Sequence, residues 1–317
     1  MNNFGWYEPK TIEQASAAMK SDGALMAGGI DLLCMLKERL IEPKRVVNLK
    51  SVSGMRTIEN GKTIRIGALV TPETIESDQN LRKRATVLSE AASVVASPQI
   101  RNVGTLGGNL CQRPRCWYFR DKDVFCLKKG GDRCYSVDGS NEYHAILGGG
   151  PCFIVHPSDL APALIALDAT VKTNTRTIKI DEFFVLPEKN VHAENVLEPG
   201  EIITEVELPA EWLDAKSSYV KVRERPSFDW ALTSCAAAFK MNGSKVSAAR
   251  IAFGGVAPIP WRSKEAEEEL IGKEISESTA RTAGRAAMAD ALPLADNPYK
   301  VELAVNTLVM AALQAVQ

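Results

Sequence analysis

Ala27-Gly28-Gly29-Ile30-Asp31-Leu32-Leu33 and a second stretch, Thr105-Leu106-Gly107-Gly108-Asn109, decide which fold the chain is expected to have. The first glycine pair separates a short apolar segment, which favours a strand over residues 24 to 27, from a helical pattern that runs to about Leu40. Backbone N–H groups beside the start of a helix suit a phosphate group. Two such loops fit one pyrophosphate, although each loop alone is also explained as a tight turn that needs glycine at positive φ.

The pattern of helices and strands around these loops changes near residue 212. Before it, Thr11-Ile12-Glu13-Gln14 is typical of a capping box at the start of a helix. Further helices are expected at 72–96 and 159–164, with strands at 45–49, 63–69, 169–172, 177–180 and 201–208. After it, strands at 218–223, 231–241 and 246–253 precede helices at 263–271, 277–291 and 299–316. Strands followed by helices indicate a separate α+β domain, so we expect domains at 1–211 and 212–317.

The overall charge and hydropathy of the chain exclude several classes of partner. The 317 residues include 38 Lys and Arg against 39 Asp and Glu, which gives a formal net charge of −1. Nucleic acid and membrane surfaces require a positive field, so neither is an expected partner. No window approaches the roughly 18 apolar residues of a membrane helix, and residues 1–6 lack the features of an export signal. We therefore expect a cytoplasmic protein, periplasmic only if it is exported with a signal-bearing partner.

A cluster of cysteines is the strongest chemical signal in the sequence. Residues 111–150 are rich in glycine and charge and have no sustained helical or strand period, which indicates a functional loop insertion that something other than an apolar core organises. In a reducing compartment, clustered thiols indicate a metal or cofactor site before disulfides. The long, unequal intervals fit an iron-sulfur cluster; zinc, which usually has a short Cys-x2-Cys hook, and free thiols remain alternatives. The cysteines of this region are Cys111, Cys116, Cys126, Cys134 and Cys152.

Other polar residues have ordinary explanations from sequence alone. The usual dinucleotide and P-loop fingerprints are absent, and the three histidines, at 144, 156 and 192, form no hydrolytic constellation. Lys221 and Arg223 alternate with apolar residues, which is typical of a solvated strand face. Asp159 precedes a helix, where it is expected to be an N-cap.

The two glycine loops, together with Ser158-Asp159-Leu160-Ala161-Pro162-Ala163-Leu164, resemble the FAD-binding medium subunit of molybdenum hydroxylases along the whole chain. This family includes xanthine dehydrogenases, aldehyde oxidoreductases and aerobic carbon monoxide dehydrogenases. The resemblance implies an α+β fold: a two-part FAD-binding domain of the vanillyl-alcohol-oxidase (PCMH) type, followed by a C-terminal domain of the CO dehydrogenase flavoprotein type. Residues 251–258, Ile-Ala-Phe-Gly-Gly-Val-Ala-Pro, resemble a strand end of that second domain.

The resemblance also implies which residues hold the FAD. The backbone of both loops would hold the pyrophosphate and ribityl chain, Asp159 and Lys221 would lie beside the cofactor, and Ile203 would pack against the flavin. Ile30 stands where many members have Thr, His or Asn, which removes one side-chain hydrogen bond. The full expected set is Met26, Ala27, Gly28, Gly29, Ile30, Asp31, Leu32, Leu33, Thr105, Leu106, Gly107, Gly108, Asn109, Asp159, Ile203 and Lys221.

The cysteine insertion, at about 111–152, resembles that of two branches of the family, in which it carries an added [4Fe-4S] cluster. Arg115-Cys116-Trp117-Tyr118-Phe119-Arg120-Asp121 and His144-Ala145-Ile146-Leu147-Gly148-Gly149 are closest to the aldehyde oxidoreductase branch; the other branch is 4-hydroxybenzoyl-CoA reductase. By position, the resemblance implies four ligands and leaves out Cys111. These ligands are Cys116, Cys126, Cys134 and Cys152.

The function implied is that of an electron-transfer subunit. A large partner subunit would hold the molybdenum cofactor and hydroxylate an aldehyde or a purine, and a small partner would carry two [2Fe-2S] clusters. The FAD here would collect the electrons and pass them on, with no catalytic residue in this chain acting on the organic substrate. The alternatives are a 4-hydroxybenzoyl-CoA reductase-like subunit, a stand-alone FAD oxidoreductase and a zinc-stabilised assembly protein.

Overall fold

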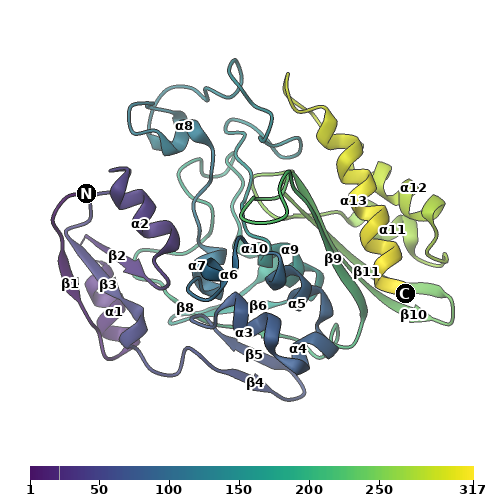
Figure 1. Ribbon diagram of the computed structural model, residues 1–317, viewed down its shortest axis with the longest axis horizontal. Helices are drawn as coiled ribbons and strands as arrows, with labels where there is room; N and C mark the ends of the chain where they lie inside the picture. The colour runs from purple at the N-terminus through teal and green to yellow at the C-terminus, as the bar shows by residue number, and fades with distance from the viewer. Residues whose placement is uncertain (21) are drawn as a thin grey trace.

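The α+β architecture expected from the sequence is confirmed by the computed structural model, which describes residues 1–20 and 22–317 (Figure 1). Within these residues the strands form sheets of three, five and four strands. The first two sheets lie in the N-terminal two thirds of the chain, and the third, with three helices, forms the C-terminal part (Figure 1).

The first sheet positions the first glycine loop. Its strands, β1 (Gly5–Tyr7), β3 (Arg45–Asn48) and β2 (Gly23–Met26), are parallel. Helix α1 (Ile12–Met19) precedes β2 and is capped by Thr11, whose Oγ1 accepts a hydrogen bond from the backbone N of Gln14. Helix α2 (Ile30–Lys37) begins four residues after β2 ends, so the glycine pair forms the turn between strand and helix.

The second sheet forms one side of the main hydrophobic core. Its order is β4 (Ile58–Asn60), β5 (Ile64–Gly67), β8 (Ile203–Leu208), β6 (Thr170–Thr173), β7 (Thr177–Lys179), and all pairs are antiparallel. Apolar residues of β5, β6 and β8 share one core with the helices above them. Those helices are α3 (Pro72–Ser77), α4 (Gln79–Arg84), α5 (Thr86–Ser93), α9 (Leu160–Ala166) and α10 (Ile180–Phe183).

The third sheet is buried on both faces, which explains its nearly continuous apolar strands. Its order is β12 (Trp261–Arg262), β11 (Lys245–Gly254), β10 (Thr233–Asn242), β9 (Lys216–Val222). Along β10, Cys235, Ala237 and Phe239 pack into one core, while Ala236 and Ala238 join the main core of the N-terminal part, as the alternation of a strand requires. The outer layer consists of α11 (Lys264–Leu270), α12 (Glu277–Ala287) and α13 (Tyr299–Val316) (Figure 1).

The cysteine insertion is largely irregular, as expected, and lies between α2 and the start of α13 (Figure 1). Its only helical turns in the described chain are α8 (Trp117–Arg120) and the 3-10 turn η2 (Leu127–Lys129). Polar contacts fix it in place: Lys128 Nζ pairs with Glu194 Oε1 at 2.7 Å, and both side chains are almost fully buried.

Several local expectations differ from the structure. The segment 72–96 is three helices, because the chain turns at Asp78, which caps α4, and at Ala85. The segment after it, for which no helix was expected, contains α6 (Pro98–Arg101) and α7 (Leu106–Leu110), which are capped by Ser97 and Thr105. The short elements β1, β4, β12, α10 and the 3-10 turn η1 (Leu49–Ser51) were not expected.

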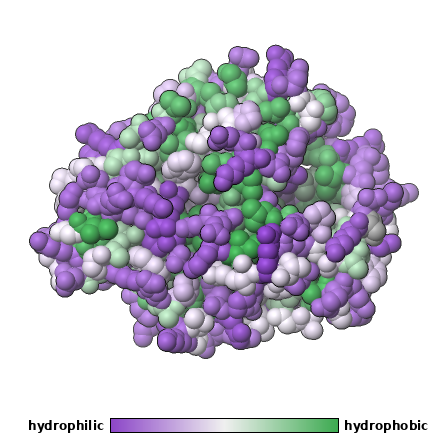
Figure 2. All heavy atoms as spheres, turned by 180° about the vertical axis from the view of Figure 1, so that it is seen from behind, coloured by the Kyte–Doolittle hydropathy of each residue, from purple (hydrophilic) through white to green (hydrophobic). Residues whose placement is uncertain are grey.

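The exterior mixes hydrophilic and apolar side chains. Figure 2 shows the face behind that of Figure 1, where apolar side chains gather near the centre among hydrophilic ones. Across the described residues, no helix combines the length and apolar character needed to cross a membrane.

Candidate functional site

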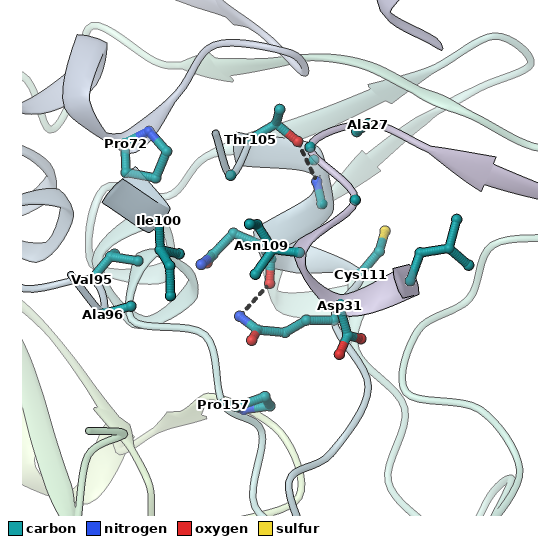
Figure 3. A pocket seen from close by; sticks show the side chains of 18 of the residues that line it. Ala27, Asp31, Pro72, Val95, Ala96, Ile100, Thr105, Asn109, Cys111 and Pro157 are labelled. Carbon is teal, nitrogen blue, oxygen red and sulfur yellow. Dashed lines mark hydrogen bonds between the residues drawn. The ribbon is translucent and has the colours of Figure 1, made fainter. Parts of the chain in front are cut away.

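One cavity of about 350 Å³ is lined by residues of both glycine loops, of β9 and of the start of β8. In Figure 3, Pro72, Val95, Ala96 and Ile100 lie on one side of it and Asp31 and Cys111 on the other, with Thr105 and Ala27 at one end and Pro157 at the opposite end. All but three of the residues predicted to hold FAD line this cavity. Of the three, Met26 and Leu106 are buried and Leu33 is exposed.

The first glycine loop uses its two glycines differently. Gly29 has φ +79° and is the N-cap residue of α2, so it needs the left-handed conformation that glycine adopts freely. Gly28 does not have positive φ, but a Cβ there would lie 2.1 Å from the carbonyl oxygen of Val103. Gly28 is therefore required because the backbone before the second loop approaches it closely.

The second loop is a capped helical turn. Thr105 Oγ1 accepts a hydrogen bond from the backbone N of Gly108 at 3.1 Å (Figure 3), and a Cβ at Gly107 would lie 3.1 Å from Ala68 Cβ. Neither Gly107 nor Gly108 has positive φ, so the tight-turn explanation is wrong for this loop. Asn109 Oδ1 accepts a hydrogen bond from Ser158 Oγ at 2.5 Å, which joins the loop to the segment before α9.

A buried ion pair lies at the wall of the cavity. Lys221 Nζ is 2.7 Å from Asp159 Oδ2, with side chains 1% and 8% exposed. The Tyr219 hydroxyl donates to Asp159 Oδ1 at 3.0 Å, and Lys221 also donates to the carbonyl of Val94 at 3.3 Å. Burial, and then the negative Asp159, raises the pKa of Tyr219 well above its usual value. A neutral tyrosine and a cation therefore share this carboxylate.

Two sequence-based expectations about these residues are wrong. Lys221 is not on a solvated strand face, because α5 and α9 pack against β9 and its neighbours and exclude water. Asp159 stands at the N-cap position of α9 but its side chain makes no capping bond; instead Ser158 Oγ accepts from the backbone N of Ala161 at 3.0 Å.

The side chain of Asp31 is turned towards the cysteine insertion. It accepts from Arg120 at 2.8 Å and from the backbone N of Arg113 at 2.8 Å, and it pairs with Arg115 at 3.0 Å. Arg115 also lies over the ring of Trp230, 5.0 Å from its centroid. Asp31 therefore ties the start of α2 to the insertion.

Several lining residues were not predicted from the sequence. Phe228 and Trp230 come from the loop between β9 and β10 and are 53% and 43% exposed. In the sequence, the only signal is that both aromatics stand among polar residues and a proline, within residues 223–230. Arg115 and Glu201 gave no such signal, since the position of each side chain depends on an ion-pair partner that is distant in the sequence. Other unpredicted lining residues include Val95, Ala96, Ile100, Gln112, Leu197 and Ile202.

Four of the clustered cysteines lie near one another: Cys134 and Cys126 act on Cys116, and Cys152 acts on Cys134. The neighbouring Cys152 lowers the pKa of Cys134 to about 5, and Cys134 raises that of Cys152. Burial raises the pKa of Cys116 to about 11, and the nearby charges of Cys134 and Cys126 add to the effect. All four are free thiols.

The other three cysteines lie apart from this group. Burial, and then the charge of Glu194, raises the pKa of Cys111 to about 12, and Cys111 lines the cavity of the glycine loops. Cys34 donates to the carbonyl of Ile30 in α2, and Cys235 is fully buried in β10. Over residues 1–20 and 22–317, no group of three or more His, Cys, Asp or Glu is close enough to hold a single metal ion.

Two matched domains and their order define a class of flavoprotein subunit. Residues 2–211 match the family described as the FAD binding domain in molybdopterin dehydrogenase, and residues 218–315 match the CO dehydrogenase flavoprotein C-terminal domain. The chain belongs to the family of FAD-binding medium subunits of molybdenum hydroxylases. It is accordingly an oxidoreductase subunit that binds FAD.

Individual relatives resemble the chain over almost its full length. The aldehyde oxidoreductase FAD-binding subunit PaoB of Escherichia coli is 37% identical, over 96% of this chain and 95% of that protein. The carbon monoxide dehydrogenase medium chain of Hydrogenophaga pseudoflava is 29% identical over 98% and 96%. A crystal structure of carbon monoxide dehydrogenase from that organism superposes with a TM-score of 0.78 at 28% identity, over 99% of this chain and 98% of that one.

Proposed function

We propose that this chain takes electrons from [2Fe-2S] clusters of a partner chain through FAD and, together with a [4Fe-4S] cluster, passes them to an external acceptor. The observation that carries the proposal is that both glycine loops and the Asp159–Lys221 pair line one cavity. We assign residues 1–211 to the FAD-binding part and 212–317 to the C-terminal part.

The cavity suits a dinucleotide whose phosphates approach backbone. The loops at 26–33 and 105–109 would hold the pyrophosphate and ribityl chain, since both line the cavity and glycine-rich backbone can approach a phosphate closely. Asp159, Lys221 and the buried Ile203 would lie on the flavin side. Bound FAD supplies a carrier that accepts electrons singly and releases two. The chain positions it and excludes water, because Lys221 and Asp159 are already desolvated.

The four neighbouring cysteines support the cluster part of the proposal. A [4Fe-4S] cluster takes four thiolates and spans a larger space than one ion, so its ligands need not converge as closely as those of zinc. Cys134 and Cys126 lie near enough to raise the pKa of Cys116, and Cys152 near enough to lower that of Cys134, whereas the pKa of Cys111 is raised by burial and Glu194 alone. Metal-thiolate bonds would also order an insertion with few apolar residues.

The partners we propose are a large subunit with the molybdenum cofactor and a small subunit with two [2Fe-2S] clusters. Support comes from the relatives, two of which are named medium chains of carbon monoxide dehydrogenases. An aldehyde is the favoured substrate of the complex, because PaoB is named a subunit of an aldehyde oxidoreductase. A 4-hydroxybenzoyl-CoA reductase-like complex and a stand-alone FAD oxidoreductase remain the competing functions, and copurification of two partner chains excludes the latter.

The test of FAD placement uses matched glycine substitutions. Gly28→Ala places a Cβ against the Val103 carbonyl and forces the two loops apart, and Gly108→Val crowds Thr105, whose oxygen is 2.9 Å from the position of a Cβ. Both variants are expected to be purified without flavin absorbance. Gly61→Ala, in a turn outside the cavity where the nearest atom is 3.4 Å away, is the control and keeps its flavin. Normal flavin content in both test variants contradicts the assignment.

A further inference from the structure

His144 makes a contact that the proposed function does not use. Its Nε2 lies 3.2 Å from Cys116 Sγ, and the residue is 3% exposed. A thiolate bound to a metal cluster has no proton and only accepts hydrogen bonds. The proton of this contact therefore belongs to His144 Nε2 whenever Cys116 is a cluster ligand.

The C-terminal part of the chain holds His144 in position. The His144 carbonyl accepts from Asn297 Nδ2 at 3.1 Å and from Lys300 Nζ at 3.1 Å, while its backbone N donates to Asn141 O at 2.9 Å. Lys300 is fully buried near the start of α13 and makes two further bonds, to the carbonyls of Tyr143 and Gly255. These bonds fix the backbone from which the imidazole reaches the sulfur.

The imidazole ring is packed as well as its backbone. The Trp117 ring lies edge-on to it, with centroids 5.5 Å apart and planes at 73°, and the Tyr118 ring lies 6.2 Å away. A histidine held at both its backbone and its ring loses little further freedom when it forms a hydrogen bond, so the contact is preorganised.

The contact lies on the side of the insertion that faces the FAD cavity. A second cavity, of about 290 Å³, is lined by Cys116 and His144, and it shares Arg115, Pro157, Asp229 and Trp230 with the cavity of the glycine loops. Of the four proposed ligands, Cys116 is the one that lines this second cavity. The contact between His144 and Cys116 therefore lines a cavity that adjoins the one proposed to hold FAD.

We propose that His144 is a positioning residue that donates its Nε2–H to the thiolate of Cys116 and so raises the reduction potential of the [4Fe-4S] cluster. The inference rests on the proposed function, since it requires the cluster. Reduction adds one electron to the cluster and increases the negative charge on its sulfurs, so a donor to one sulfur stabilises the reduced form more than the oxidised form. The one-electron reductant is the [2Fe-2S]-bearing partner already proposed.

The experiment compares midpoint potentials of the cluster in the purified complex. Potentials are measured at one fixed pH by electron paramagnetic resonance during a redox titration, and iron is counted in each sample. His144→Leu removes the donor, His144→Gln keeps an N–H near the same place, and Tyr143→Phe is the control, because the Tyr143 hydroxyl is bonded to Glu224 instead.

We expect His144→Leu to make reduction about tenfold less favourable, which is about 59 mV for a one-electron couple. His144→Gln is expected to restore most of the shift, and Tyr143→Phe is expected to match the wild type. An unchanged potential in His144→Leu with full iron content overturns the inference alone. Absence of iron from the wild-type chain overturns the proposed cluster itself.

A second measurement detects the hydrogen bond in the wild-type protein itself. With all histidines labelled with ¹⁵N, the reduced wild-type cluster is expected to show a weak nitrogen coupling in pulsed electron paramagnetic resonance. This ¹⁵N coupling is expected to be replaced by a ¹⁴N coupling in unlabelled protein and to be lost in His144→Gln carrying the label. A fully loaded wild-type cluster with no ¹⁵N coupling contradicts the hydrogen bond even if His144→Leu does not fold.

Discussion

Lys221→Met is expected to destabilise the protein by about 3 kcal/mol, within the range of about 3–5 kcal/mol that breaking a buried ion pair typically costs. The pair is almost fully desolvated and its atoms are 2.7 Å apart. Removing the ammonium leaves the Asp159 carboxylate buried, with the Tyr219 hydroxyl as its remaining donor among the contacts found. That donor offsets part of the loss and places the expected value at the lower end of the range.

The assay is urea unfolding of the chain without flavin, followed by titration with FAD. The double variant Asp159→Asn with Lys221→Met removes both charges and is expected to recover most of the stability, because no unpaired charge stays buried. Lys240→Met is the control, since Lys240 pairs with the exposed Glu211 and such a pair contributes about 1 kcal/mol or less. A loss below about 1 kcal/mol in Lys221→Met, or a double variant that loses the sum of both single losses, refutes the reasoning.

Three further predictions follow from the site. Arg176 holds the pKa of the buried Glu201 at about 2. Because the pKa is lowered in the folded state, this pair stabilises the protein above about pH 4.5, and about 1–2 kcal/mol of stability is lost as the pH falls towards 2. Glu201→Gln is therefore expected to make stability less dependent on pH between these two pH values. Single Cys→Ser variants are expected to keep about four irons per chain at Cys111, Cys34 and Cys235 and to lose them at the four proposed ligands; stoichiometric zinc in anaerobically purified protein, or loss at Cys111 with retention at Cys152, contradicts this. The isolated chain is expected to pass electrons from an artificial reductant to an acceptor but to leave aldehydes and purines unchanged; substrate-dependent turnover free of molybdenum favours the stand-alone oxidase.

Much of the fold follows from local pattern. The long strands of the third sheet and the helices after them were expected within a few residues of their positions, because the apolar runs of β9, β10 and β11 and the helical period of α12 and α13 extend over many residues. The short helices α6 and α7 were missed although Ser97-Pro98 and Thr105 are ordinary capping signals, since four or five residues give too short a window for periodicity.

The site was predicted less evenly than the fold. The glycine loops were located because the need for glycine is set by nearby residues. The burial of Lys221, by contrast, depends on which helices cover β9, and those helices come from another part of the chain. The same holds for Asp31, whose partners Arg115 and Arg120 are more than eighty residues away. Side-chain pairing across such distances leaves no periodic trace in the sequence.

The cofactor content of this chain within its native complex is the most direct test of the central claim. The complex is purified without oxygen, its chains are separated, and FAD, iron, sulfide and molybdenum are assigned to each. The account predicts FAD and about four irons on this chain, molybdenum on a larger partner and the remaining iron on a smaller one. A chain that purifies alone, carries no flavin or oxidises substrate without molybdenum would contradict it.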